Sequence, residues 1–262
     1  MYGRGKIRNF VAMNVNERHI HPRDAAIGFD AATHTYYVGG VEYDSVTTLV
    51  ESCFEQFDAE YWAARKATPG HTREMILQEW AAKGEAARNL GTLMHERIES
   101  YYLGNPVEPA WMADPTFRIF AAFATDVRLC PFRTEWRIFH EESRIAGTLD
   151  FLALRPDRRL EIWDWKRSTK VVDSLGRPIA ANPYGKCAFE PIGHVPDTTY
   201  HHYALQVSIY RYILAEKYGV DTVAAHLGVF HPDCGRYYVV DLPYMRDEVE
   251  ALVSSRCAVE SV

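Results

Sequence analysis

Two largely apolar runs dominate the pattern of this chain, Ile145-Ala146-Gly147-Thr148-Leu149-Asp150 and Glu161-Ile162-Trp163-Asp164-Trp165-Lys166. They predict two buried strands, in which a carboxylate is costly unless a cation pairs with it. Asp164 and Lys166 are two residues apart, so their side chains point to the same face of a strand. Two carboxylates and an ammonium on neighbouring strands suit a hard divalent cation and a phosphate, the groups of metal-assisted phosphodiester hydrolysis.

Polar groups in three other segments complete the pattern. A helix is predicted around His95, and Glu135 lies in an alternating stretch before the first run. Gln206 and Tyr210 are four residues apart, so on a helix they share one face. We expect Gly91, one turn before His95, to let its helix approach the sheet closely. The predicted order is therefore helix, three strands, helix, strand.

With these motifs in this order, the chain resembles the PD-(D/E)XK nucleases of the RecB-type branch, which includes the mitochondrial genome maintenance exonuclease. The resemblance covers about residues 41–238 and rests on four motifs: Gly-x-x-x-His at 91–95, Gly-x-x-Asp at 147–150, Asp-x-Lys at 164–166 and Gln-x-x-x-Tyr at 206–210. Residues 165–168 and 230–232 are also similar to segments in nucleases of large DNA viruses. Asp164 stands where many relatives carry Glu, which the family pattern allows.

The resemblance implies an α/β fold with a restriction-endonuclease-like PD-(D/E)XK core. In that core a mixed central sheet is flanked by helices, and here an N-terminal β-hairpin and a helical extension precede it. We divide the chain into an irregular, flexible arm over residues 1–25 and one nuclease domain over 26–262. The domain comprises an N-terminal extension (26–90), a catalytic core (91–242) and a C-terminal helix (243–262).

Local patterns predict the individual elements. Gly39-Gly40 between apolar runs indicates a hairpin turn, and Ser45 is suited to cap the helix that follows it. A break near Pro69-Gly70 interrupts a long helical stretch. We expect strands at 27–30, 34–38, 41–43, 132–140, 144–154, 159–166, 224–231 and 236–241, helices within 58–102, at 115–128 and 200–218 and from about 244, and an irregular segment over 168–199.

The resemblance also implies the chemistry, a deoxyribonuclease that uses Mg²⁺ or Mn²⁺ to hydrolyse phosphodiester bonds. The implied catalytic residues are Asp150, Asp164, Lys166, Gln206 and Tyr210, and the implied metal ligands are His95, Asp150, Asp164 and the backbone carbonyl of Trp165. Glu135 and Glu99 are further candidates near the metal. Two carboxylates stabilise the charge of Lys166, so we expect it protonated and stabilising negative charge that develops on the phosphate.

The net charge of −6 predicts a confined basic groove rather than a basic surface. We assign DNA contacts to Arg167, Lys170, Lys186, His202 and Arg211. The long segment of residues 167–199 leaves the predicted catalytic strand directly, and long irregular segments in compact domains tend to be functional. We expect it to form a wall or a lid of the DNA channel.

We expect an exonuclease acting on single-stranded or free-ended DNA. Alternatives are a structure-specific or restriction-like endonuclease, a non-catalytic nucleic-acid-binding module, and a phosphoesterase for small nucleotides. The intact set of Asp150, Asp164, Lys166 and Gln206 argues against the non-catalytic module. DNA is the expected partner, beside unidentified replication or recombination proteins. The sequence shows no phosphate-binding Gly-rich motif, so we expect no nucleotide cofactor.

Five widely spaced cysteines indicate a reducing, intracellular compartment. Cytoplasm, nucleus and viral factory are not separated by this argument, and the basic residues Arg4, Lys6 and Arg8 are a weak sign of mitochondrial import. The cysteine spacing does not fit an iron–sulfur cluster, so none is expected. The chain has no apolar run of about 18 residues, so no membrane span is expected.

Overall fold

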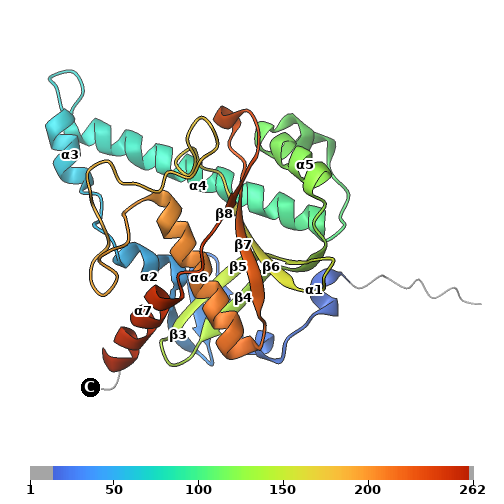
Figure 1. Ribbon diagram of the computed structural model, residues 1–262. Coiled ribbons are helices and arrows are strands. Elements are labelled where there is room, and N and C mark those ends of the chain that lie inside the picture. Colours follow the sequence, from blue (N-terminus) through green and yellow to red (C-terminus); the bar gives the residue numbers. More distant parts are fainter. Residues whose placement is uncertain (1–13, 260–262) are drawn as a thin grey trace, which may run out of the picture.

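The computed structural model describes residues 14–259 (Figure 1). The strands are β1 Ile27–Asp30, β2 Thr35–Val38, β3 Val41–Ser45, β4 Pro131–His140, β5 Ile145–Leu154, β6 Leu160–Lys166, β7 Thr222–Val229 and β8 Tyr238–Asp241. The α-helices are α1 Val15–Arg18, α2 Val46–Ser52, α3 Ala59–Lys66, α4 Arg73–Tyr102, α5 Pro115–Val127, α6 Thr199–Tyr218 and α7 Arg246–Val259. Short 3-10 helices are η1 Pro22–Ala26, η2 Pro109–Ala113 and η3 Pro232–Cys234.

The described strands form one eight-stranded mixed sheet in the order β1-β2-β3-β5-β6-β7-β8, and β4 pairs with β5. The pairs β3–β5 and β6–β7 are parallel, while β4–β5, β5–β6 and β7–β8 are antiparallel. β5 and β6 pair from Leu154 opposite Leu160 up to Phe151 opposite Trp163. Nearly every residue of β5 and β6 is buried, and since side chains alternate along a strand, both faces of these central strands are covered.

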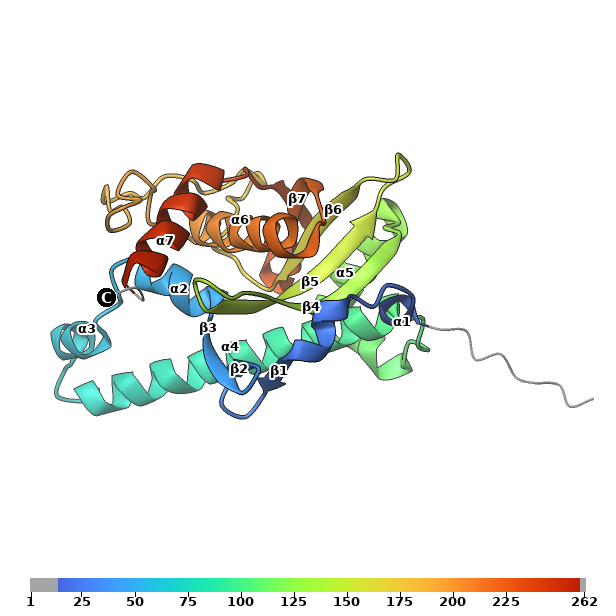
Figure 2. The same cartoon turned by 90° about the horizontal axis from the view of Figure 1, so that it is seen from below.

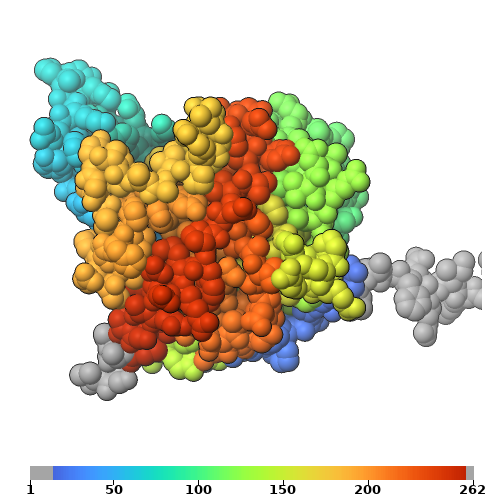
Figure 3. Space-filling model, viewed as in Figure 1, coloured from blue at the N-terminus to red at the C-terminus, as the bar shows by residue number. Residues whose placement is uncertain are grey.

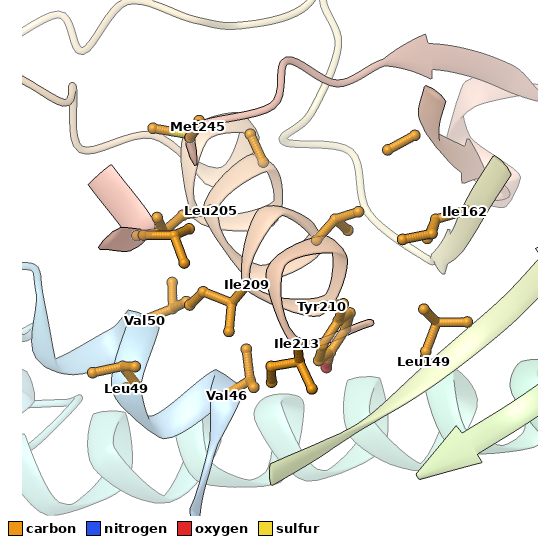
Figure 4. Packing of buried hydrophobic residues seen from close by; sticks show 14 of the residues in the cluster. Val46, Leu49, Val50, Leu149, Ile162, Leu205, Ile209, Tyr210, Ile213 and Met245 are labelled. Carbon is orange, nitrogen blue, oxygen red and sulfur yellow. The ribbon is translucent and has the colours of Figure 1, made fainter. Parts of the chain in front are cut away.

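Helices cover both faces of the sheet, as Figure 2 shows from below. On one face, α2, α6 and α7 bury a large core in which Val46, Leu149 and Ile209 take part (Figure 4). On the other face, the last turns of α4 and the aromatic side of α5 pack on Phe151 and Trp165. The mixed α/β fold with a sheet flanked by helices is therefore confirmed.

Side-chain caps explain where the helices begin. The hydroxyls of Ser45, Thr72 and Thr198 accept hydrogen bonds from backbone amides in the first turns of α2, α4 and α6. Helix α6 ends at Gly219, which adopts the left-handed conformation typical of a C-terminal cap. The predicted cap at Ser45 and the predicted hairpin at residues 39–40 are confirmed. The other expected strands and helices appear close to their predicted bounds.

Helix α4 contains 30 residues and leaves the sheet in its first half (Figures 1 and 2). Its C-terminal half is anchored by Met94 and Ile98, which are buried. Near its start, Ile76 is buried in the hairpin that α4 forms with α3. Between these anchors, every residue of 81–90 except Gly84 is exposed. The middle of α4 is therefore packed against the rest of the protein only at its two ends. We call residues 81–90 the bridge of α4.

The expectation of an irregular arm through residue 25 is wrong from residue 14 onward. Val15 is buried, and Asp24 accepts hydrogen bonds from Arg133 (2.8 Å) and from the indole of Trp136 (2.7 Å). These side chains fasten the N-terminal segment to β4, which a polar sequence pattern does not reveal. Residues 1–13 of the predicted arm lie outside the described residues. Among the helices of residues 14–259, none is long and apolar enough to cross a membrane.

Candidate metal and phosphate site

The two predicted acidic residues meet where β5 and β6 part. The regular pairing of these strands ends at Phe151 and Trp163, and the next residues are Asp150 and Asp164. Asp150 Oδ2 accepts a hydrogen bond of 2.7 Å from the backbone amide of Trp165. The Asp150 carboxylate thus takes the place of a backbone acceptor, and this opens the sheet at the site.

His95 reaches the same place from helix α4. Its Nε2 lies 2.9 Å from the backbone carbonyl oxygen of Trp165, so this nitrogen donates. Its Nδ1 lies 3.6 Å from Asp150 Oδ2 and 3.6 Å from Glu135 Oε1. Burial opposes protonation of His95, but the Asp150 and Glu135 carboxylates outweigh it and raise its pKa to about 9. The structure therefore brings together His95, Asp150 and Glu135, which the sequence pattern had singled out.

Glu135 enters the site through an unusual backbone. It lies on β4 between Thr134, opposite Phe151, and Trp136, opposite Leu149. Its φ is +45°, in the left-handed region that costs a residue with a Cβ about 1–2 kcal/mol. Residues strained in this way cluster at functional sites. Glu135 forms a potential metal-binding group with His95 and Asp150, in which one ligand atom of each lies within 4.8 Å of the others.

Lys166 and Asp164, whose spacing predicts that they share one face of a strand, form a buried ion pair. Lys166 Nζ lies 2.7 Å from Asp164 Oδ2, and the side chain of Asp164 is 1% exposed. Burial raises the pKa of Asp164 to about 6, helped by the charge of Asp150 and opposed by Lys166. Burial would lower the pKa of Lys166, but Asp164 and Asp150 raise it well above its usual value. Lys166 is therefore protonated, as expected.

The residues present fit a divalent cation by one test. Oδ1 of Asp164 has no hydrogen-bond partner among the described residues, whereas Oδ2 is paired with the Lys166 ammonium. A buried carboxylate oxygen without a donor is costly, and a cation would satisfy it. Asp164 lies outside the group formed by His95, Glu135 and Asp150. A cation that also reached Asp164 would have two aspartates, an imidazole and the Trp165 carbonyl as donors, a set that suits Mg²⁺ or, with the nitrogen ligand, Mn²⁺.

Gln206 and Tyr210 line the site from helix α6. Gln206 Nε2 donates to the Tyr210 hydroxyl at 3.0 Å, and both side chains are buried. Figure 4 shows Tyr210 reaching from α6 toward β5. Gly147 makes room for it: a Cβ at this position would lie 2.6 Å from Cε1 of the ring. The Tyr210 hydroxyl is therefore held between the Gln206 amide and the backbone of β5 at Gly147.

Two expectations near His95 are not met. A Cβ on Gly91 would meet no atom within 4 Å, so the expected close approach of the helix at this residue is wrong. The helix does not approach the sheet closely at Gly91 because α4 first packs on the sheet at Met94. Glu99 is half-buried one turn after His95, and burial raises its pKa, with Arg137 opposing and Glu96 adding to the shift. Glu99 does not join the potential metal-binding group.

The five residues assigned to DNA contacts lie in different surroundings. Lys170 and Arg167 line a groove beside the site, and Arg167 also contacts Thr116. Lys186 pairs with Glu55 on the surface. The ring of His202 stacks on Phe54 and pairs with Asp197. The last two are thus engaged by other parts of the protein.

Arg211 is placed differently from what we expected. Its guanidinium donates to the hydroxyl and the carbonyl oxygen of Thr222 and lies over the ring of Tyr244. Thr222 pairs with Leu160, at the opposite end of β6 from Lys166. Seven residues of strand span roughly 20 Å, so Arg211 fastens α6 to β7 far from the ion pair. Its position on α6 gave no sign of this distance.

The groove beside the site holds a volume of about 760 Å³. One wall is the exposed stretch of α4, and the other is formed by residues 167–170 and the start of α6. Tyr203 connects the groove to the site, because the Lys166 ammonium lies 4.7 Å from the centre of its ring. The sequence had not singled out Tyr203 or Lys83. The spacing of residues 80, 83, 84 and 87, which places them on one helix face, was the available signal.

Comparisons with known proteins give a limited result. No family model matches the chain, and no curated protein matches it. A crystal structure of SSO0001 is 14% identical, with a TM-score of 0.34, over 83% of this chain and 75% of that one. A crystal structure of LHK-Exo in complex with dAMP is 15% identical, with a TM-score of 0.35, over 84% of this chain and 88% of that one. Similarity at this level carries no argument about function, which rests on the site itself.

Proposed function

We propose that this protein is a metal-dependent deoxyribonuclease that hydrolyses phosphodiester bonds. The activity that we propose is that of an exonuclease on single-stranded or free-ended DNA. The observation that carries the proposal is the buried Asp164, whose Oδ2 pairs with Lys166 and whose Oδ1 has no hydrogen-bond donor among the described residues. A structural ion pair alone would leave Asp150, His95 and Glu135 without a reason to converge beside it.

Mg²⁺ or Mn²⁺ would be held by Asp150, Asp164, His95 and the Trp165 carbonyl, with Glu135 as a further candidate. When bound, the cation supplies Lewis-acid chemistry toward a phosphate oxygen and lowers the pKa of water. The protonated Lys166 then stabilises negative charge that develops on the phosphate. Gln206, whose amide donates one hydrogen bond to Tyr210, would donate its other amide hydrogen to a phosphate of the substrate.

Of the three alternative functions, the non-catalytic module fits the site poorly, and the two other enzymes would use the same site. A non-catalytic binding module needs no buried aspartate–lysine pair beside a second aspartate. A phosphoesterase for small nucleotides would use the same site and would show no affinity for DNA. An endonuclease would use the same side chains, and only the form of the DNA that is cut separates it from an exonuclease.

The deciding test compares cleavage of end-labelled linear single-stranded DNA with cleavage of closed circular single-stranded DNA, in Mg²⁺ or Mn²⁺. We expect cutting of the linear strand alone, and its loss in Lys166→Ala. Lys217→Ala is the matched control, because Lys217 pairs with Glu142 outside the site. Cutting of the circle would establish an endonuclease instead. If no DNA or RNA substrate, single-stranded, duplex or flapped, is cut with either metal, the proposal is wrong.

A further inference from the structure

The groove along α4 has walls that suit a particular ligand. Trp80, Lys83, Gly84 and Ala87 line it, and their spacing places them on one face of the helix. In a globular protein such a face is ordinarily buried against another element. Here the two small residues leave the face open, and a groove of about 760 Å³ lies against it. A volume of this size is within the range of ligand sites.

The charge of the groove favours phosphate groups. Lys83 stands on the α4 wall, and Arg167 and Lys170 stand on the opposite wall, which begins directly after Lys166. His231 and one carboxylate, Asp233, also line the groove. Three cations against one carboxylate make the groove locally basic in a chain of net charge −6. This is the local charge that a polyanion requires.

Aromatic rings on the two walls favour unpaired bases. Trp80 comes from α4 and Tyr203 from α6, and both line the groove. A lysine ammonium lies over one face of each ring, Lys66 at 5.4 Å from the centre of Trp80 and Lys166 at 4.7 Å from the centre of Tyr203, so a base would stack on the opposite face. Unpaired bases stack on such rings without regard to sequence, whereas the bases of a duplex already stack on one another.

The groove is continuous with the site through Tyr203. It lies between the bridge of α4 and the segment after β6, which stand side by side in Figures 1 and 3. We infer that this groove binds a single-stranded stretch of the nucleic acid whose phosphodiester is cut beside Lys166. This inference rests on the proposed function and names its substrate as an unpaired strand, several nucleotides long, with phosphates toward Lys83, Arg167 and Lys170.

The test fills the groove at one residue and compares the same change on its neighbour. Ala87→Phe places a ring in the groove, whereas Ala86→Phe places it on an exposed position of the same helix that does not line the groove. Binding of fluorescent oligothymidylate is measured by anisotropy in EDTA, so that no hydrolysis occurs. We expect Ala87→Phe to weaken binding about tenfold or more and Ala86→Phe to leave it unchanged. Equal thermal unfolding midpoints show that both variants are folded.

Several outcomes would overturn the inference. One is equal binding by the two variants, whether both keep the wild-type affinity or both lose it. Another is competition by duplex DNA as strong as that by single-stranded DNA. Oligouridylate is a second probe, and the tighter of the two ligands tells whether DNA or RNA is the strand.

The wild-type protein is also assayed on thymidine 5′-(p-nitrophenyl) phosphate, a diester too small to need the groove. If this diester is hydrolysed but Ala87→Phe shows no selective loss of binding, the inference about the groove is wrong and the proposed nuclease activity stands. Selective loss of binding without hydrolysis of any diester would refute the proposed nuclease and leave the groove as a binding site.

Discussion

At position 147, the absence of a side chain lets Tyr210 reach β5. A Cβ there would also lie 3.2 Å from the Tyr210 hydroxyl and 3.2 Å from Val46. Tyr210 and Val46 belong to the same core, so neither can move without opening it. The glycine of the Gly-x-x-Asp motif therefore has a packing reason, which is to allow the contact that fixes Gln206.

We predict that Gly147→Ala is destabilised by about 1–3 kcal/mol, because the core is overpacked. It should also lose nuclease activity, since Tyr210 moves and releases Gln206. Gly91→Ala is the control, because a Cβ at that helical position meets nothing within 4 Å. It should be neutral or up to about 1 kcal/mol more stable. Urea unfolding checks both, and equal stability of Gly147→Ala and wild type would contradict the packing argument.

At position 164, a buried carboxylate oxygen without a donor predicts stabilisation by metal. Mn²⁺ at about 100 times its dissociation constant should stabilise the protein by about 2.7 kcal/mol. The gain should vanish in Asp164→Asn, which removes the charge at the site. Asp157→Asn is the control, because this exposed aspartate pairs with Arg159 on the surface. Thermal unfolding with and without Mn²⁺ decides, and a gain retained in Asp164→Asn would place the metal elsewhere.

At position 135, the backbone conformation predicts a reversal of the usual preference between alanine and glycine. Glu135 has a φ of +45°, so Glu135→Gly should be more stable than Glu135→Ala by about 1 kcal/mol. At the exposed Arg137 on the same strand, alanine should be the more stable of the two. Urea unfolding of the four variants checks this. The same order at both positions would mean that residue 135 is not strained.

At the scale of elements, the segment from α1 to β1 is tied to β4 by several hydrogen bonds, in which Asn16, Arg23 and the Asp24 carboxylate take part. Asp24 accepts hydrogen bonds from the amide of His21, from Arg133 and from Trp136. Burial would raise the pKa of Asp24, but these hydrogen bonds outweigh it and lower the pKa below its usual value. The ionised form of Asp24 therefore stabilises the attachment of this segment to the sheet.

A lowered pKa fixes the direction of the pH dependence. The stability contributed by Asp24 is fully present above the pKa of an unfolded aspartate, about 3.9, and is lost as pH falls through the lower value of the folded protein. Asp24→Asn should cost about 1–2 kcal/mol from pH 7 to about pH 5, and less below about pH 4. Asp44→Asn, at a half-exposed pair with Arg256, should cost less than about 0.5 kcal/mol. Urea unfolding across this range is the measurement, and a cost of Asp24→Asn that does not depend on pH would rule out the ionic contribution.

At the scale of the whole molecule, an excess of acidic residues coexists with one basic groove. If phosphates contact only Lys83, Arg167 and Lys170, few counterions are released on binding. For three contacts to a single strand, the logarithm of the binding constant should fall with the logarithm of salt concentration with a slope of about −2. Lys83→Gln should reduce the slope by about 0.7, and Lys217→Gln should leave it unchanged. Anisotropy titrations at several salt concentrations test this, and a much steeper slope would require contacts outside the groove.

The sequence by itself determined the central strands, the helix of His95 and the pairing of Asp164 with Lys166. These depend on local rules, because alternation along a strand and the four-residue spacing of a helix are periodic properties of the backbone. The caps at Ser45, Thr72 and Thr198 follow from local hydrogen bonds. Local rules also made Lys166 protonated, since its partner is only two residues away.

Only the tertiary structure decided which distant residues meet. Glu135 joins His95 and Asp150 because β4 pairs with β5 and bends at a left-handed residue. Arg211 lies far from the site because its position along α6 places it beside the far end of β6. Residues 14–26 are fastened to β4 by Asn16, Arg23 and Asp24. The exposed face of α4 becomes one wall of a groove only when residues 167–170 lie opposite it. Contacts between distant segments depend on how the elements pack, which no local periodicity encodes.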